Sequence, residues 1–157
     1  MEIPKYSALQ IAKYFIKQGQ KEAENKLTPL KLQKILYYAQ GWYLANYDKP
    51  LFKDVIQAWK LGPAIYSIYK AFERYGNTPI KENIDDDEIN MIGKDDREFL
   101  NKIWSVYKKY SASDLIDSTH SEKPWISTRL DIKANENTDA EINLTVIRDY
   151  FKELISQ

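Results

Sequence analysis

The sequence contains no cysteine and a single histidine, His120. The absence of cysteine excludes disulfides, thiolate zinc sites and cysteine nucleophiles. With one histidine, a zinc site would depend almost wholly on carboxylates, which suit harder cations better. Only five glycines occur, and none clusters into a phosphate-cradling loop. The sequence therefore predicts no metal site and no cofactor.

The sequence also lacks an excess of one charge and any long apolar run. Lysine and arginine number 23, as do aspartate and glutamate, so the formal net charge is zero. Dedicated nucleic-acid-binding proteins usually carry a basic excess that neutralises phosphates. No apolar stretch approaches the roughly 18–20 residues that span a bilayer, and the N-terminus MEIPKYSALQ lacks a signal-peptide pattern. We therefore predict a cytoplasmic protein that does not enter a membrane.

The aromatic content is the least ordinary feature of the composition. The 157 residues fit one domain with a real core, and 43% of them are apolar. Among them are twelve tyrosines, five phenylalanines and four tryptophans. Tyrosine and tryptophan suit cores and protein interfaces alike, so the excess is a mild pointer to an interface.

Charge is distributed unevenly along the chain. Residues 1–34 hold seven lysines against three glutamates, whereas residues 81–98 hold eight acids against three bases. Two opposed patches would orient a partner, and the alternative is two solvated surfaces. The run Asp85-Asp86-Asp87-Glu88 lacks the alternation and the glycine of an EF-hand loop. It is therefore predicted to be a solvated acidic loop.

The segment TPLKLQKILYYAQGWYLAN predicts the central helix of the fold, over about residues 29–46. Thr28 is the expected N-cap, and Pro29 occupies the first helical position, where its missing N–H does no harm. Apolar residues lie on two opposite faces, which is typical of a helix surrounded by protein. Gly41 costs about 1 kcal/mol relative to alanine in a helix, so it predicts the close approach of another element.

The remaining pattern is mostly helical. A first helix is expected from Ser7 to Gly19, another from about Asp96 to Tyr110, and a short one over SASDLIDSTH. Gly62-Pro63 is expected to open a helix that ends at Gly76, and T-D-A-E at Thr138 resembles a capping box opening the last helix. Short strands are expected at Val55–Lys60 and Thr78–Lys81. We therefore predict a mainly α fold, a single compact helical domain over residues 1–157 with a minor short β element.

The stretch STHSEKPW raises the question of catalysis, because it holds His120 beside serines, a threonine and a glutamate. A histidine titrates near neutral pH and suits general base catalysis. Catalytic partners, however, usually come from distant segments of the chain. The structural alternative is that His120 bonds backbone groups and braces a loop that Pro124 and Trp125 fix. A small His120-dependent enzyme and a structural loop both stay open, and the structural one is favoured.

The lysines near the central helix admit a nucleic-acid alternative. Lys26, Lys31 and Lys34 would contact phosphates, and tyrosines would stack on bases. No helix-turn-helix pairing with a basic recognition helix stands out. A nucleic-acid-binding regulator is therefore the minority hypothesis.

Several blocks occur in an order that resembles the SocA-like antitoxin family, also called the Panacea or GepA domain. These blocks are YSALQIAKYF, LTPLKLQKILYYAQGWYLA, PLF, IQAWKLGPAIYSIYKAFERYG and THSEKPW. The resemblance covers about residues 5–130, and AWKLGP and THSEKPW are its most telling parts.

The resemblance implies an antitoxin that neutralises a cognate protein toxin by direct binding, without catalysis. In one branch of the family the antitoxin also acts as an adaptor for a ClpXP-type protease. Some members carry an additional N-terminal DNA-binding domain, for which this sequence, beginning at the family's first helix, is expected to have no room.

The resemblance also implies roles for particular residues. The family's T-H-x-x-x-P-W-like signature falls on Thr119, His120, Pro124 and Trp125, which are expected to define a structural loop. Residues in the family blocks that are not obviously core are the candidates for partner contact. They are Lys31, Gln33, Lys34, Tyr37, Trp59, Tyr66 and Tyr69.

Overall fold

The helix that the sequence places at the centre of the fold is its most buried long element. The structure is a computed structural model and describes residues 2–157. Helix α2 (Pro29–Tyr47) begins after Thr28, whose hydroxyl accepts the Lys31 amide hydrogen at 3.3 Å, as predicted. Most of α2 is buried because its apolar residues point in several directions around the helix axis. The other elements therefore surround it.

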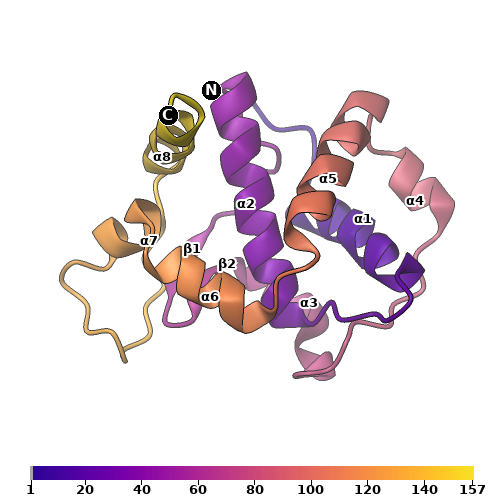
Figure 1. Cartoon of the computed structure of the whole chain (residues 1–157), viewed down its shortest axis with the longest axis horizontal. Helices are drawn as coiled ribbons and strands as arrows, with labels where there is room; N and C mark the ends of the chain where they lie inside the picture. The colour runs from indigo at the N-terminus through magenta and orange to yellow at the C-terminus, as the bar shows by residue number, and fades with distance from the viewer. Residues whose placement is uncertain (1) are drawn as a thin grey trace.

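The four longest of the other described helices pack directly on α2 (Figure 1), as does the short helix α3 (Tyr66–Phe72). These four are α1 (Ala8–Lys21), α5 (Lys94–Tyr107), α6 (Ala112–His120) and α8 (Leu144–Ile155). Helix α1 begins at the predicted cap, where the Ser7 hydroxyl accepts the Gln10 amide hydrogen at 3.2 Å. Three shorter helices, α3 (Tyr66–Phe72), α4 (Asp86–Asn90) and α7 (Lys123–Thr128), and the 3₁₀ turn η1 (Glu73–Tyr75) complete the described part of the chain. The mainly α fold class is thereby confirmed.

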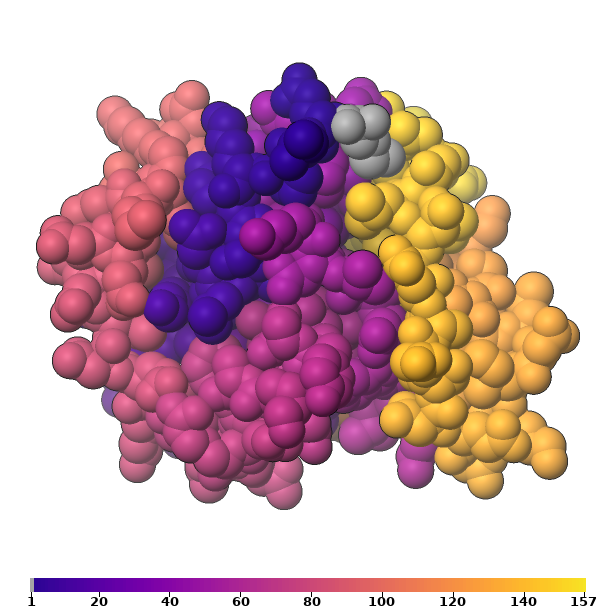
Figure 2. Space-filling model, turned by 180° about the vertical axis from the view of Figure 1, so that it is seen from behind, coloured from indigo at the N-terminus to yellow at the C-terminus, as the bar shows by residue number. Residues whose placement is uncertain are grey.

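The close approach predicted at Gly41 is made by α8. A Cβ atom built on Gly41 would lie 2.2 Å from Cε2 of Phe151 on α8. Real side chains do not approach so closely, so the Phe151 ring occupies the space that a larger residue would need. Figure 2 shows the C-terminal segment against the central part of the chain, with the N-terminal segment on its other side.

The β element is a two-stranded antiparallel hairpin, β1 (Gln57–Trp59) and β2 (Gly62–Ala64). The expected strand at Val55–Lys60 is therefore confirmed in its centre, but two neighbouring predictions are wrong. Gly62 and Pro63 belong to β2, so helix α3 opens later, at Tyr66. Thr78–Lys81 forms no strand, because its backbone makes one bond to the segment before α2, from the Ile80 N–H to the Leu27 carbonyl at 2.9 Å.

The predicted start of the last helix is also wrong. Helix α8 begins at Leu144, and Asn143 caps it by accepting the Thr145 amide hydrogen at 2.7 Å. The residues that resembled a capping box instead run beside β1. The Ala58 N–H donates to the Ala140 carbonyl and the Ile142 N–H to the Ile56 carbonyl, both at 2.8 Å. A partner distant in sequence has therefore overridden a local helix signal.

The acidic segment is exposed to solvent, as predicted, but forms the short helix α4 and not a loop. Asp85 caps α4, and Glu88 completes a capping box with it. Lys13 of α1 pairs with Glu88 at 2.8 Å, and Lys17 lies 3.7 Å from Asp86. The basic and acidic stretches of the sequence therefore partly neutralise each other within the chain.

Candidate partner-binding groove

An open groove lies at the N-terminal end of α2, bordered by the hairpin and α3. Figure 1 shows the positions of these elements. The volume of the groove is about 830 Å³. Four of the residues predicted to contact a partner line it together with residues that the sequence analysis did not single out. The lining residues are Pro29, Leu30, Gln33, Lys34, Trp59, Lys60, Leu61, Gly62, Ala64, Tyr69, Glu73, Gly76, Asn77 and Asn137. We call this the hairpin groove.

Exposed apolar and aromatic side chains surround the hairpin groove. Trp59 packs edge-on against Tyr69, with ring centroids 5.4 Å apart, and its indole N–H donates to the Gln57 side-chain oxygen at 2.6 Å. Tyr69 is 44% exposed and Leu61, in the hairpin turn, is 49% exposed. Tyr66, one turn before Tyr69 on α3, is 56% exposed. Large apolar side chains that remain accessible beside a groove are typical of protein-binding surfaces.

A buried lysine lies beneath the hairpin. Lys34 is only 1% exposed, and its ammonium group donates to the Pro63 carbonyl at 3.1 Å. A Cβ atom on Gly62 would lie 2.7 Å from Cε of Lys34, and Gly62 has a φ of +107°, so only glycine suits this position. Burial lowers the pKa of Lys34 to about 7, because removal from water disfavours the charged form.

The other predicted contact residues of α2 are also buried. Gln33 holds the backbone of Ile65, donating to its carbonyl at 3.0 Å and accepting its amide hydrogen at 2.8 Å. Lys31 donates to the Lys108 carbonyl at 2.5 Å, and burial lowers the pKa of this lysine. Tyr37 donates to the Glu122 carboxylate at 2.9 Å. Lys31 and Tyr37 are buried and do not line the hairpin groove, so the structure does not present them for partner contact.

The burial of Lys31 and Lys34 also bears on nucleic-acid binding. Both were candidates for phosphate contact, but both are buried and the ammonium group of each donates a hydrogen bond to a backbone carbonyl. Of the three lysines in that hypothesis, Lys26 alone is exposed, and it lies 3.6 Å from Glu24. The structure therefore gives no support to a basic phosphate-binding surface formed by these three lysines.

The residues of the THSEKPW block join α6 and α7 to the hairpin. The His120 ring stacks on Trp125 with centroids 4.1 Å apart, and Nε2 donates to the Lys60 carbonyl at 3.0 Å. The Trp125 indole N–H donates to the Trp59 carbonyl at 2.7 Å. Thr119 is buried and bonds the Ile116 carbonyl, and Pro124 lies in the first turn of α7. Burial lowers the pKa of His120, which favours the neutral ring. These contacts support a structural role, but the expected loop is wrong, because Thr119 and His120 end α6 and Pro124 and Trp125 lie in α7.

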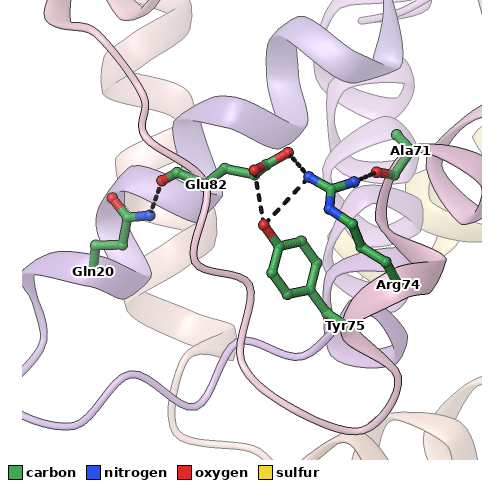
Figure 3. Close-up of polar contacts among 5 residues, drawn as sticks. All are labelled: Gln20, Ala71, Arg74, Tyr75 and Glu82. Atoms are coloured by element: carbon green, nitrogen blue, oxygen red, sulfur yellow. Dashed lines mark hydrogen bonds and ion pairs between the residues drawn. The ribbon is translucent and has the colours of Figure 1, made fainter.

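A polar cluster fixes the 3₁₀ turn η1 at the edge of the hairpin groove (Figure 3). Arg74 bonds Glu82 and donates to the Ala71 carbonyl at 2.7 Å, while the Tyr75 hydroxyl donates to Glu82 at 2.8 Å. The Gln20 side chain of α1 donates to the Glu82 carbonyl. Glu73, between α3 and this cluster, lines the groove. The bond with Arg74 also holds the pKa of Glu82 below its usual range.

Sequence reasoning missed several residues of the hairpin groove because they come from separate segments. Asn137 lies far along the chain, yet its side-chain oxygen accepts the Lys60 amide hydrogen at 3.2 Å. Leu61 lies inside the AWKLGP block and is exposed at the hairpin turn. A correct prediction of the hairpin would have indicated this exposure.

Comparison with known proteins identifies the family. The model of the antitoxin SocA-like, Panacea domain matches residues 32–126, from α2 into α7. Antitoxin SocA of Caulobacter vibrioides (strain NA1000 / CB15N) is 30% identical over 141 residues, covering 80% of this chain and 72% of the relative. No solved structure matches the chain. The chain therefore belongs to the antitoxin SocA-like, Panacea domain family, as its sequence blocks predicted.

Among residues 2–157, no helix has both the length and the apolar character needed to cross a membrane.

Proposed function

We propose that this chain is the antitoxin of a toxin–antitoxin pair and neutralises its cognate protein toxin by binding it directly. Membership of the antitoxin SocA-like family is the observation that carries the antitoxin role. The proposal places the protein in the cytoplasm, where its toxin would be made, and gives it no catalytic step.

The hairpin groove supports a binding role at a particular place. Trp59, Tyr66, Tyr69 and Leu61 expose apolar surface around a concave site that Gln33 and Lys34 support from below. Binding energy at protein interfaces concentrates in a few such aromatic anchors. Trp59, Tyr66 and Tyr69 are therefore the proposed direct contacts, while Gln33 and Lys34 position the backbone on which these residues stand.

The environment of His120 supports a structural and not a catalytic role. Its Nε2 hydrogen is given to the Lys60 carbonyl, and one face of its ring lies against Trp125. The bond and the stack hold the ring against the hairpin, as a bracing role requires. Replacement of His120 is therefore expected to act through the packing of α6 against the hairpin.

Binding to the product of the neighbouring gene tests the proposal. That protein is co-purified with this chain, and the affinity is then measured by calorimetry for the wild type, Tyr69→Ala and Leu61→Asp. Removal of an interface anchor costs about 2 kcal/mol, or roughly thirtyfold in affinity. Tyr47→Ala is the matched control, because Tyr47 is similarly exposed at 51% but lies at the other end of α2.

The outcomes separate the parts of the proposal. Co-purification with weakened binding by Tyr69→Ala and Leu61→Asp, but not by Tyr47→Ala, supports both the antitoxin role and the hairpin groove. Unchanged affinity of the two groove variants refutes the groove while leaving the antitoxin role. A neighbour that is harmless when expressed alone and does not bind refutes the toxin–antitoxin pair.

A role as protease adaptor is a separate part of the proposal, implied by the resemblance alone. It predicts that the toxin bound to this antitoxin is degraded in cells that contain a ClpXP-type protease and persists in cells that lack it. Equal toxin half-lives in the two strains would refute the adaptor role without affecting direct neutralisation.

A further inference from the structure

A second groove lies between α2, α5, α6 and α8 and shares no lining residue with the hairpin groove. Its volume is about 600 Å³. Aromatic and acidic side chains dominate its walls. The lining residues are Tyr38, Trp42, Val106, Tyr107, Tyr110, Asp114, Leu115, Asp117, Ser118, Glu122, Phe151 and Leu154. We call this the acidic aromatic groove.

The aromatic rings of this groove are held in fixed positions. Tyr38 and Tyr107 stack with centroids 4.3 Å apart, and the Trp42 indole N–H donates to the Tyr107 hydroxyl at 2.8 Å. Phe151 meets Trp42 edge-on at 4.9 Å. Tyr110 is 38% exposed and therefore accessible to a ligand. Rigid aromatic faces attract cations because their π-electrons present negative charge.

Carboxyl groups are the only strongly acidic or basic side chains among the lining residues that the structure describes. Asp114, Asp117 and Glu122 are carboxylates, and no lysine, arginine or histidine is among the lining residues that the described chain provides. Outside the lining, Lys109 places its ammonium 5.3 Å from the Tyr110 ring centroid. Asp114 is already engaged in capping α6, whereas Asp117 is exposed on the same helix.

Glu122 is the most unusual group in the groove, because it is a buried carboxylate without a cation. It is 7% exposed, accepts the Tyr37 hydroxyl hydrogen at 2.9 Å, and lies 2.7 and 3.1 Å from the hydroxyls of Tyr38 and Ser118. Within residues 2–157, no lysine or arginine forms an ion pair with it. Burial raises the pKa of Glu122, against the lowering effect of the hydroxyls. Buried charges are normally paired, so a cation entering the groove would gain a favourable field.

We propose that the acidic aromatic groove binds an arginine side chain of a protein partner. The planar guanidinium would stack on the Tyr110 and Trp42 side of the groove and pair with Asp117, under the field of Glu122. The aliphatic part of the side chain would pack against Val106 and Leu154. The inference stands on the charge and aromatic lining of this groove and does not depend on the hairpin groove.

The test uses nuclear magnetic resonance on the full chain labelled with ¹⁵N. The probe is N-acetyl-L-arginine amide, and the matched control is N-acetyl-L-citrulline amide, which has nearly the same shape without the charge. The indole N–H signal of Trp42 reports on the acidic aromatic groove, and that of Trp59 reports on the hairpin groove. A single side chain is expected to bind with a dissociation constant on the order of millimolar.

Two variants and one control variant locate the binding. Asp117→Asn removes the exposed carboxylate and is expected to weaken binding about threefold to fivefold. Tyr110→Leu removes an accessible aromatic face and is expected to weaken it similarly. Asp87→Asn makes the same charge change on exposed α4 and should leave the affinity unchanged.

The proposal predicts a saturable shift of the Trp42 signal with the arginine amide, little shift with the citrulline amide, and a steady Trp59 signal. Shifts of equal size with both amides would contradict it. So would an unsaturated response at tens of millimolar, or a shift that Asp117→Asn and Tyr110→Leu leave intact. None of these outcomes depends on the identity of a toxin, so failure here leaves the proposed antitoxin function untouched.

Discussion

Replacing Lys34 with methionine should change how the stability of the protein depends on pH. In the unfolded chain a lysine titrates near its ordinary pKa of 10.5, whereas burial under the hairpin lowers the pKa of Lys34 to about 7. Between these two values the unfolded chain binds a proton that the folded protein does not. The free energy of unfolding of the wild type therefore rises with pH across this window.

The size of the effect follows from the two pKa values. Each pH unit over which only the unfolded chain holds the proton adds about 1.4 kcal/mol to the free energy of unfolding. Because Lys34 is half-deprotonated at pH 7 and almost wholly deprotonated at pH 9 in the folded protein, the rise over this interval is about 2 kcal/mol. Methionine has no charge to lose and packs in a similar volume, so Lys34→Met lacks this contribution.

Urea unfolding at a series of pH values measures the effect as a difference between the wild type and Lys34→Met. Taking the difference removes the other titrating groups, and the lost bond to the Pro63 carbonyl adds a constant offset. Lys102→Met on the exposed side of α5 is the control and should follow the wild-type curve. A wild-type minus Lys34→Met difference that stays constant from pH 7 to pH 9 would refute the reasoning. Lys34 would then be solvated or paired in solution.

Three further substitutions test the packing. Gly41→Ala should destabilise the protein by about 1–3 kcal/mol, because the new methyl group collides with the Phe151 ring. This cost should exceed the gain from the better helix propensity of alanine. Thermal unfolding measures the change, and a stabilised variant would contradict the prediction. Asn143→Ala should cost about 1 kcal/mol through loss of the α8 cap, whereas Thr138→Ala should cost much less, and equal costs would contradict the observed helix start. Trp125→Phe should cost about 1 kcal/mol by removing the indole bond to the hairpin, and an unchanged denaturant midpoint would contradict that bond.

Local signals in the sequence predicted the centre of the fold correctly. The two-sided apolar pattern of α2, its Thr28 cap and the close approach at Gly41 all depend on residues near each other along the chain. Each is a statement about one helix and its immediate needs. This is why α2 was predicted almost to its ends.

Strand pairing explains why the same reasoning failed elsewhere. The segment before α8 resembled a helix start, but its backbone pairs with β1 through Ala140 and Ile142. Gly62 and Pro63 resembled the start of a helix, but they pair with β1 in antiparallel register and so belong to β2. The pairing with Ala140 and Ile142 joins segments far apart in the sequence, whereas the β1–β2 pairing is local but overrides the helix-start signal of Gly62-Pro63.

The candidate site was predicted only in part for a related reason. Trp59, Tyr66 and Tyr69 lie at or beside the hairpin groove with accessible rings, as expected of contact residues. Lys31 and Lys34 resembled solvated helix lysines, yet carbonyls of the segment after α5 and of β2 accept their hydrogens in the interior. Whether a helix lysine is buried depends on which other segments pack over it, and the sequence of the helix alone does not predict those segments.

Co-expression with the neighbouring gene is the measurement that tests the central claim most directly. Expression of the neighbouring gene is induced alone or together with one form of this chain, and growth is followed. The three forms are the wild type, the double variant Tyr69→Ala/Leu61→Asp, called the groove variant, and the control Tyr47→Ala. The account predicts arrest by the neighbour alone, rescue by the wild type and by Tyr47→Ala, and loss of rescue with the groove variant at equal protein level. Rescue by the groove variant as complete as by the wild type would contradict binding through the hairpin groove, and a neighbour that never slows growth would contradict the antitoxin role.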